Sequence, residues 1–248
     1  MSKSFIYIAN WKMHKSYHEA ITWCLQYKDE LVQLSTRNTV AICPQFTDIV
    51  ELTNIFKNTA LKIGAQNCAA YESGSYTGEV SAVSLAQSGC SYCIVGHSER
   101  RIYFHETDDT IMQKVFILLK NTLIPILCIG ETAQEKEQGL TFKVLEKQLY
   151  GLRSPSWNLL PTLPTIIIAY EPVWAIGSGI IPDHNKLETV LLWIADYVSS
   201  IHPCSFKILY GGSVNGNTSA TLKKLAHLDG FLIGGASLDF QELKKIVL

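Results

Sequence analysis

The chain has 248 residues, of which 47% are hydrophobic and 17% charged, and its formal net charge is −1. This ordinary globular balance contains no block of like charge, so we expect neither nucleic acid nor a membrane as a partner. The seven cysteines are odd in number and several lie inside apolar runs, which is typical of buried thiols in a cytoplasmic protein. We expect no targeting segment, because the apolar run before Asn10 is too short.

Eight short apolar runs, rich in β-branched and aromatic residues, predict strands, and most of them are apolar throughout, as in strands covered on both faces. Helical patterns lie between some of them, at residues 17–34, 107–121 and 183–201. Strand and helix alternating eight times in about 250 residues predict one α/β domain over residues 1–248, a closed (β/α)8 barrel with eight parallel strands and outer helices. The predicted strands are residues 4–10, 40–44, 62–67, 92–97, 124–130, 165–171, 207–212 and 230–235.

Cys90 and Cys93 form a C-x-x-C pair, which is the spacing of a redox motif or of half a zinc site. A zinc site would need a second pair or a nearby histidine cluster, and the sequence offers neither. We therefore interpret this pair as the entrance of a strand.

Polar and charged residues follow most of the predicted strands. In a barrel the carboxyl ends of the strands meet at one mouth, which is where barrel active sites are built. Each residue alone could be a helix cap or a turn residue, but caps do not require lysine, histidine or glutamate, so the set favours an active site. Its members are Asn10, Lys12, Gln66, Asn67, His97, Ser98, Glu99, Glu131, Glu171, Ser213 and the glycine pairs at 211–212 and 234–235.

Glu171 ends the most apolar strand in the segment TIIIAYEPVWAIGSG, residues 165–179. A carboxylate walled by Val173, Trp174 and Ile176 would lose contact with water, which suits a general base. The alternative is a structural acid in an ion pair.

The loop after this strand has a stiff start at Pro172 and a free end at Gly177 and Gly179. A stiff apolar body between two hinges behaves as a lid that closes and expels water. An ordinary connecting loop is the alternative, but Trp174 and Ile176 would be poor choices for a loop that stays in water, so we favour the lid.

Three further residues near the first and fourth strands suit an anionic, oxygen-rich ligand. His97 precedes a helical segment, whose positive end disfavours the charged imidazolium and leaves a neutral ring that can donate a hydrogen bond to a carbonyl oxygen. Asn10 and Lys12 are two residues apart, so an extended strand would place both side chains on one face. The alternative for Lys12 is a structural ion pair, for example with Glu99.

Glycine pairs end the last two predicted strands, in YGGSV (210–214) and IGGAS (233–237). Bare backbone N–H groups beside a short helix form phosphate sites at this place in barrels. One pair is weak support, but two pairs on neighbouring strands are much stronger.

Five blocks of the sequence closely resemble the triosephosphate isomerase family in order and spacing, from the first strand to the last helix. The block EPVWAIG is the most specific of them. The resemblance implies the interconversion of dihydroxyacetone phosphate and glyceraldehyde 3-phosphate through an enediolate, in glycolysis and gluconeogenesis, without a metal or cofactor. The matching blocks are ANWKM (9–13), VGHSERR (95–101), YEPVWAIGSG (170–179), LYGGSV (209–214) and GFLIGGASL (230–238).

The resemblance also implies a role for each matching residue. Glu171 would move the proton between the two carbons, and His97 would polarise the carbonyl as a neutral ring. Lys12 would offset the negative charge of the phosphate and the enediolate, and Asn10 would add a hydrogen bond. Backbone N–H groups of four residues would bind the phosphate: Gly177, Ser213, Gly234 and Gly235.

A supporting set and a dimer contact are implied in the same way. The family is typically a homodimer, residues 65–81 resemble its interdigitating loop, and Thr77 matches the residue that reaches the partner's site. Tyr210 and Ser213 would hold the closed lid. The supporting residues would be Ser98, Glu99, Cys128 and Glu131.

The chain departs from the family at positions that surround the reacting residues. The altered lid at Ser178 and Ile180 could change the closure rate, and the changes at loop positions could weaken the dimer. Two alternatives stay open: a phosphate-binding or surface-interaction protein that keeps the barrel without the activity, and another phosphate-using barrel enzyme. The remaining departures are His14, Lys15, Ser75, Tyr76 and His105.

Overall fold

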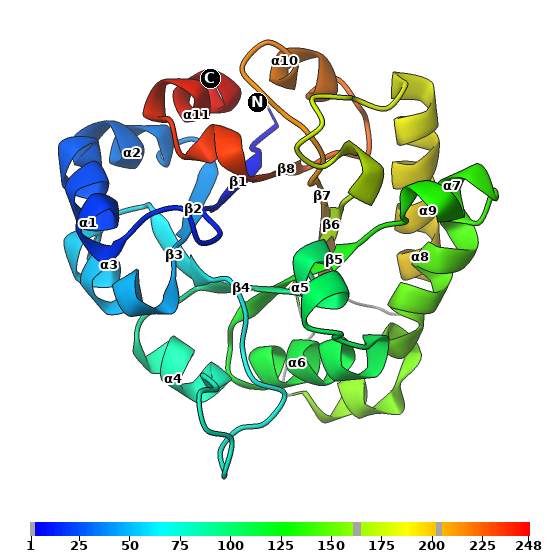
Figure 1. Cartoon of the computed structure of the whole chain (residues 1–248), viewed down its shortest axis with the longest axis horizontal. Helices are drawn as coiled ribbons and strands as arrows, with labels where there is room; N and C mark the ends of the chain where they lie inside the picture. The colour runs from blue at the N-terminus through cyan, green and yellow to red at the C-terminus, as the bar shows by residue number, and fades with distance from the viewer. Residues whose placement is uncertain (1–2, 161–164, 202–204) are drawn as a thin grey trace.

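A computed structural model describes residues 3–160, 165–201 and 205–248 of the chain. Its parallel strands form a closed barrel in which each strand pairs with its neighbours in sequence and β8 pairs with β1, and helices surround this barrel (Figure 1). The predicted (β/α)8 architecture is therefore confirmed. The strands are β1 Ile6–Asn10, β2 Thr39–Cys43, β3 Lys62–Ala65, β4 Tyr92–Val95, β5 Ile124–Ile129, β6 Thr165–Tyr170, β7 Ser205–Tyr210 and β8 Gly230–Ile233.

The helices follow the strands around the outside of the barrel, and both chain ends lie close together beside β1 (Figure 1). In the described part of the chain, no helix is long and apolar enough to cross a membrane. The α-helices are α1 Tyr17–Gln26, α2 Lys28–Leu34, α3 Ile49–Ile55, α4 Ala82–Gln87, α5 Ser98–Tyr103, α6 Asp108–Lys120, α7 Ala133–Glu137, α8 Thr141–Leu149, α9 His184–Ile201, α10 Ser219–Leu222 and α11 Phe240–Val247. Short 3-10 turns lie at Phe46–Asp48, Tyr150–Arg153, Pro155–Leu159, Val173–Ala175 and Gly235–Ser237.

All eight predicted strands are present, but several end earlier than predicted. His97 and Glu171 come just after β4 and β6. The helix predicted over residues 17–34 is two helices, because Tyr27 leaves the helical conformation at φ −112° and ψ 18°. The earlier strand ends place His97 and Glu171 in the loops at the mouth of the barrel.

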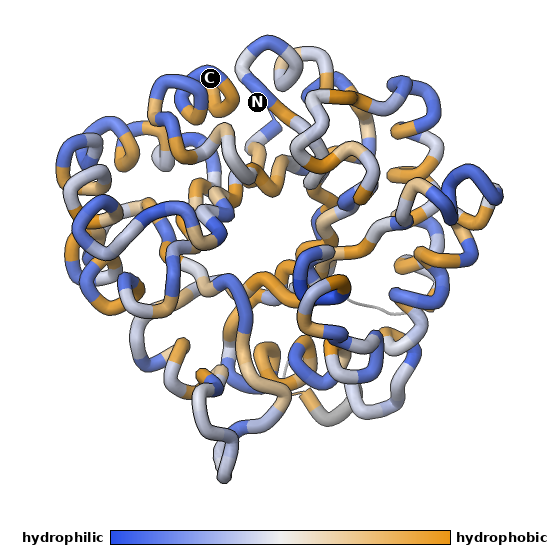
Figure 2. The backbone as a smooth tube through the Cα atoms, in the orientation of Figure 1, coloured by the Kyte–Doolittle hydropathy of each residue, from blue (hydrophilic) through white to orange (hydrophobic). Residues whose placement is uncertain are grey.

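Two apolar clusters hold the barrel together, and hydrophobic residues, orange in Figure 2, lie on both the strands and the surrounding helices. Side chains alternate between the clusters along each strand, so Ile8 lies inside the barrel while Tyr7 and Ala9 pack against the helices. The barrel is thus a packed core with a rigid rim. Its interior is filled by Ile8, Ala41, Cys43, Tyr92, Ile94, Ile126, Cys128, Ile167, Ala169, Leu209 and Leu232.

The cysteines in the described ranges are free and buried. Cys90 precedes β4 and Cys93 lies within it, which agrees with the interpretation of the pair as a strand entrance. Burial raises the pKa of Cys90 to about 12 and that of Cys93 well above the usual thiol value. Cys204, the remaining cysteine, lies outside the described residues.

Candidate active site

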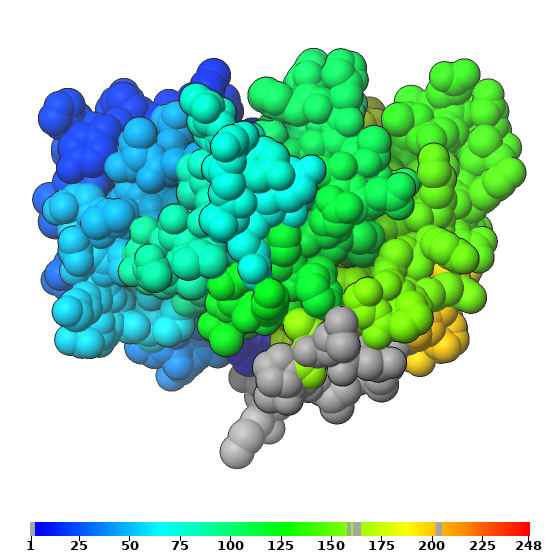
Figure 3. Space-filling view, turned by 90° about the horizontal axis from the view of Figure 1, so that it is seen from below, coloured from blue at the N-terminus to red at the C-terminus, as the bar shows by residue number. Residues whose placement is uncertain are grey.

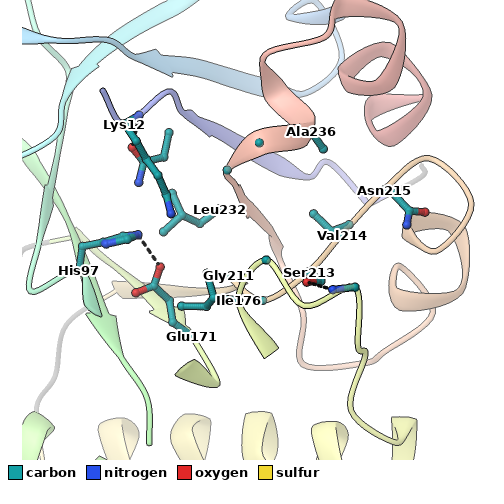
Figure 4. A pocket seen from close by; sticks show the side chains of 16 residues that line it. Lys12, His97, Glu171, Ile176, Gly211, Ser213, Val214, Asn215, Leu232 and Ala236 are labelled. Atoms are coloured by element: carbon teal, nitrogen blue, oxygen red, sulfur yellow. Dashed lines mark hydrogen bonds and ion pairs between the residues drawn. The ribbon is translucent and has the colours of Figure 1, made fainter. Parts of the chain in front are cut away.

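A cavity of about 260 Å³ opens at the mouth of the barrel (Figure 4). Loops that follow β1, β4, β6, β7 and β8 supply its lining. The sequence-predicted catalytic and substrate-binding residues all line it, namely Asn10, Lys12, His97, Glu171, Gly177, Ser213, Gly234 and Gly235.

Glu171 lies at the floor of this cavity and is only 2% exposed. Its Oε1 is 3.2 Å from Nε2 of His97, and its Oε2 accepts the backbone N–H of Ser98 at 3.3 Å. Its own N–H donates to Ile129 O at 2.7 Å, so the residue is fixed to the end of β5. A carboxylate held this way by the scaffold can accept a proton from a ligand in the cavity.

The ring of His97 is oriented by the start of α5. The backbone N–H of Glu99 donates to Nδ1 at 3.2 Å, so Nδ1 is the acceptor nitrogen. The proton of the neutral ring then lies on Nε2, which points toward Glu171 (Figure 4). This tautomer can donate a hydrogen bond to a ligand oxygen, and that role of His97 stays a prediction.

Lys12 lines the cavity, but its backbone conformation differs from the extended strand that the sequence argument assumed. β1 ends at Asn10, and Lys12 takes a left-handed conformation with φ 51°, so the two residues do not share one face of a strand. Asn10 Oδ1 accepts the N–H of Lys12 at 3.1 Å, and Gln66 donates to its backbone oxygen at 2.7 Å. Both side chains still line the cavity, because these contacts support the turn.

The ion pair considered as an alternative for Lys12 is also present. Its ammonium group lies 2.5 Å from Glu99 Oε1, and its side chain is 21% exposed. The pair therefore holds the lysine at the cavity wall, and its role toward an anionic ligand stays a prediction.

The opposite wall is formed by backbone at the ends of β7 and β8. Gly234 precedes the turn Gly235–Ser237, and a Cβ on Gly234 would lie 3.7 Å from Lys12 Cε. The Lys12 side chain thus lies beside the start of a short helical turn, a kind of place where backbone N–H groups bind oxyanions.

The lid loop, residues 172–179, covers one side of the cavity. Gly177 and Gly179 have φ values of 66° and 74°, which L side chains rarely adopt, so both hinge positions suit glycine. Ser213 Oγ donates to Ala175 O at 2.6 Å and accepts the N–H of Gly179 at 3.1 Å. Ser178 Oγ closes the loop on itself by donating to Ala175 O at 3.1 Å.

Trp174 does not wall Glu171, contrary to the sequence argument. Its indole N–H donates to Glu131 Oε1 at 2.8 Å, on the outer side of the lid loop. Ile176 does line the cavity with Glu171. The reason is that Glu131, although it follows β5, lies behind the lid loop and binds the indole there.

The other supporting residues differ in their contacts. Ser98 and Glu99 touch the catalytic candidates directly. Cys128 lies buried in the barrel interior, and burial together with the charge of Glu171 raises the pKa of its thiol. The hydroxyl of Tyr210 is buried and has no hydrogen-bond partner within the described ranges, so its lid contact stays a prediction.

Several residues that line the cavity were not assigned a catalytic or substrate-binding role from the sequence, although Gly211 and Gly212 were expected at the mouth. Leu232 projects from β8 into the barrel, a position that its alternation with Phe231 and Ile233 could have indicated. Gly211 lies against the Glu171 side chain, a contact between two strands that no local pattern could have revealed. The others are Gly212, Val214, Asn215 and Ala236.

Residues 66–80 form a loop that stands out from the body of the molecule (Figures 1 and 3). Thr77 near its tip is exposed, and the rings of Tyr71 and Tyr76 stack at 4.0 Å. A second cavity of about 530 Å³ lies beside the first, and it is lined in part by Met13, Phe46 and Tyr103. Large apolar side chains are therefore exposed around the mouth on this side.

The geometry defines a class of protein. A buried carboxylate can move a proton between two neighbouring carbons of one ligand, while an imidazole Nε2–H beside it donates to the oxygens on those carbons. A lysine and a glycine-rich wall would bind an anionic group on that ligand. The fold and site are those of a barrel enzyme for proton transfer on a small phosphorylated compound.

Comparison with known sequences specifies the family. The profile described as triosephosphate isomerase matches residues 5–248. A triosephosphate isomerase of Endomicrobium trichonymphae is 39% identical over 96% of this chain and 95% of its own length. That of Alkaliphilus oremlandii is 39% identical over 98% of both chains, and that of Acidithiobacillus ferrooxidans is 43% identical over 85% of this chain and 82% of its own. The chain belongs to the triosephosphate isomerase family.

Proposed function

We propose that this cavity carries out the reaction of its family. The chain is an aldose–ketose isomerase that interconverts dihydroxyacetone phosphate and glyceraldehyde 3-phosphate in glycolysis. The observation that carries the proposal is the contact of Glu171 with His97 Nε2 in a cavity that also holds Lys12.

The proposed chemistry assigns one task to each side chain. Glu171 takes a proton from the carbon beside the carbonyl and returns it to the neighbouring carbon. His97 donates its Nε2 hydrogen bond to the carbonyl oxygen and moves protons between the two oxygens of the enediolate. Lys12 and Asn10 stabilise the negative charge that develops, through preorganised electrostatics.

The phosphate would lie against the glycine-rich wall. Backbone N–H groups of Gly177, Ser213, Gly234 and Gly235 are the proposed donors. Because Ser213 Oγ already binds Ala175 and Gly179, phosphate held there would favour a closed lid loop. Closure excludes water and holds the enediolate in the plane that resists loss of phosphate.

We further propose a homodimer in the cytoplasm. The loop around Thr77 would enter the second cavity of a partner, beside Lys12. Tyr103 at 71% and Phe104 at 63% exposure lie near this cavity and would be covered. An exposed apolar area of this kind is typical of an interaction site.

Coupled turnover of glyceraldehyde 3-phosphate tests the proposal, with Lys12→Met and His97→Gln beside the unmodified chain. Each variant should lose at least about 100-fold in kcat/KM, because each removes a polar group from the cavity. Lys15→Met is the matched control and should keep most of the activity, since Lys15 does not line the cavity. An unmodified chain that binds phosphoglycolate without turnover would support the phosphate-binding barrel instead.

Sedimentation of Thr77→Arg tests the dimer separately. A bulky cation at the loop tip should weaken self-association and lower activity together. A variant that stays dimeric, or an unmodified chain that is monomeric and active, would contradict this part of the proposal.

A further inference from the structure

We propose that Lys136 is a positioning residue for the lid loop: its ammonium group, stacked on the indole of Trp174, holds the start of the loop against Glu131. The inference rests on the proposed closure of the lid loop and adds to it a residue outside the cavity. Lys136 lies on α7, far from the lid loop in sequence.

Glu131 is the residue to which the start of the lid loop is hydrogen-bonded. Its backbone oxygen accepts the N–H of Val173 at 3.0 Å, and its carboxylate accepts the indole N–H of Trp174 at 2.8 Å and the hydroxyl of Tyr170 at 3.1 Å. The residue is 1% exposed, and burial raises the pKa of its carboxyl group. The carboxylate is held by Trp174 and Tyr170, and the backbone of the same residue is held by Val173, so Glu131 cannot rotate freely and sets the orientation of the indole.

The ammonium group of Lys136 packs on the face of the Trp174 indole. Its Nζ lies 3.2 Å from the centre of the Trp174 ring, well inside the roughly 6 Å range of a cation–π contact. A capping box between Thr132 and Glu135 fixes the start of α7, the helix that carries the lysine. The positive charge also favours the ionised form of Glu131, which is the form that accepts the indole N–H at full strength.

The lid loop is therefore held at two separate places. Ser213 binds its far part through Ala175 and Gly179, on the side of the cavity. Lys136 holds its near part through Trp174, on the outer side. Loss of Lys136 should loosen the near part alone.

The direction of the effect follows from where the contacts lie. Trp174 lines an outer groove with Lys136, while Ile176 and Gly177 of the same loop line the active-site cavity. Movement of the loop toward a bound phosphate would draw the indole away from Lys136, because the outer groove and the cavity are lined by different residues of the loop. The cation–π contact thus opposes closure, and its removal favours the ligand-bound position.

Fluorine NMR of protein labelled with 5-fluorotryptophan tests the inference, with the Trp174 resonance assigned from Trp174→Phe. In Lys136→Ala without ligand this resonance should shift or broaden. The variant should also bind phosphoglycolate about 3- to 10-fold more tightly, which is the range expected for one cation–π contact. Lys136→Arg should restore both properties, and Lys143→Ala, an exposed lysine on α8, should change neither.

An unchanged Trp174 resonance in Lys136→Ala would overturn the inference, and so would unchanged or weaker binding of phosphoglycolate. Weaker binding would show that the lysine only supports the local structure. Failure of the unmodified chain to bind phosphoglycolate would instead refute the proposed function, while the resonance of the ligand-free protein would still decide the role of Lys136.

Discussion

Gly211→Ala should displace the side chain of Glu171, the proposed base, while leaving its carboxylate group chemically unchanged. A Cβ on Gly211 would lie 2.7 Å from Cγ of Glu171. Carbon atoms prefer separations of about 3.5–4.0 Å, so the glutamate must move by about 1 Å. That movement would disturb its 3.2 Å contact with His97 and its 3.3 Å contact with Ser98.

A 1 Å error in the position of a catalytic group costs roughly 100-fold in rate. We therefore expect kcat to fall about 100-fold, which corresponds to about 2.7 kcal/mol in the activation barrier. The assay is coupled turnover at saturating glyceraldehyde 3-phosphate. Binding of phosphoglycolate should change much less, because the phosphate wall is not displaced.

A double-mutant cycle supplies the control. In a Glu171→Ala background there is no Cγ to displace, so adding Gly211→Ala should leave the residual activity unchanged. The reasoning fails if Gly211→Ala alone keeps kcat within about threefold of the unmodified chain, or if its effect is the same in both backgrounds.

Three further predictions concern stability and reactivity. His105 has φ 52°, a left-handed conformation that favours glycine, so His105→Gly should raise the unfolding free energy by about 0.5–1 kcal/mol in urea titrations at fixed protein concentration, and a decrease would contradict this reasoning. Burial raises the pKa of Glu106, but hydrogen bonds and charges from Lys114 and Arg100 outweigh it and lower the pKa below 4.5. Ionised Glu106 therefore stabilises the fold above about pH 4.5, and this stabilisation is lost as the pH falls below that value. The melting temperature of Glu106→Gln should depend less on pH between pH 5 and about 3 than that of the unmodified chain. The same pH dependence in both proteins would refute this. In a Cys204→Ser background the folded protein should react slowly with Ellman's reagent at pH 8, because the described thiols are buried and burial raises the pKa of Cys90 to about 12, and a rapid reaction would show an open thiol.

The sequence predicted the strands well because strands buried on both faces are nearly continuous apolar runs. Tyr27 was missed as a break because its neighbours continue the helical pattern on both sides. Strand ends were placed too late where a glycine or histidine follows without a clear change in polarity, as at His97.

The site was predictable to the extent that it depends on which residues end the strands. The conformation of Lys12 was not, because a left-handed residue supported by Gln66 leaves no local signal. Nor were the partners of Trp174, since Glu131 and Lys136 follow β5 and lie beside Trp174 only because β5 and β6 are paired. Contacts between the ends of neighbouring strands depend on register, which a pattern along one strand does not contain.

The most direct test compares turnover and phosphoglycolate binding in the unmodified chain and in Glu171→Gln. The amide keeps the size of the carboxylate but cannot take the proton. We predict that turnover of glyceraldehyde 3-phosphate falls by at least about 1,000-fold, within the range for a lost general base, while phosphoglycolate affinity changes by less than about tenfold. Turnover of Glu171→Gln close to that of the unmodified chain would contradict the assignment of Glu171 as the base.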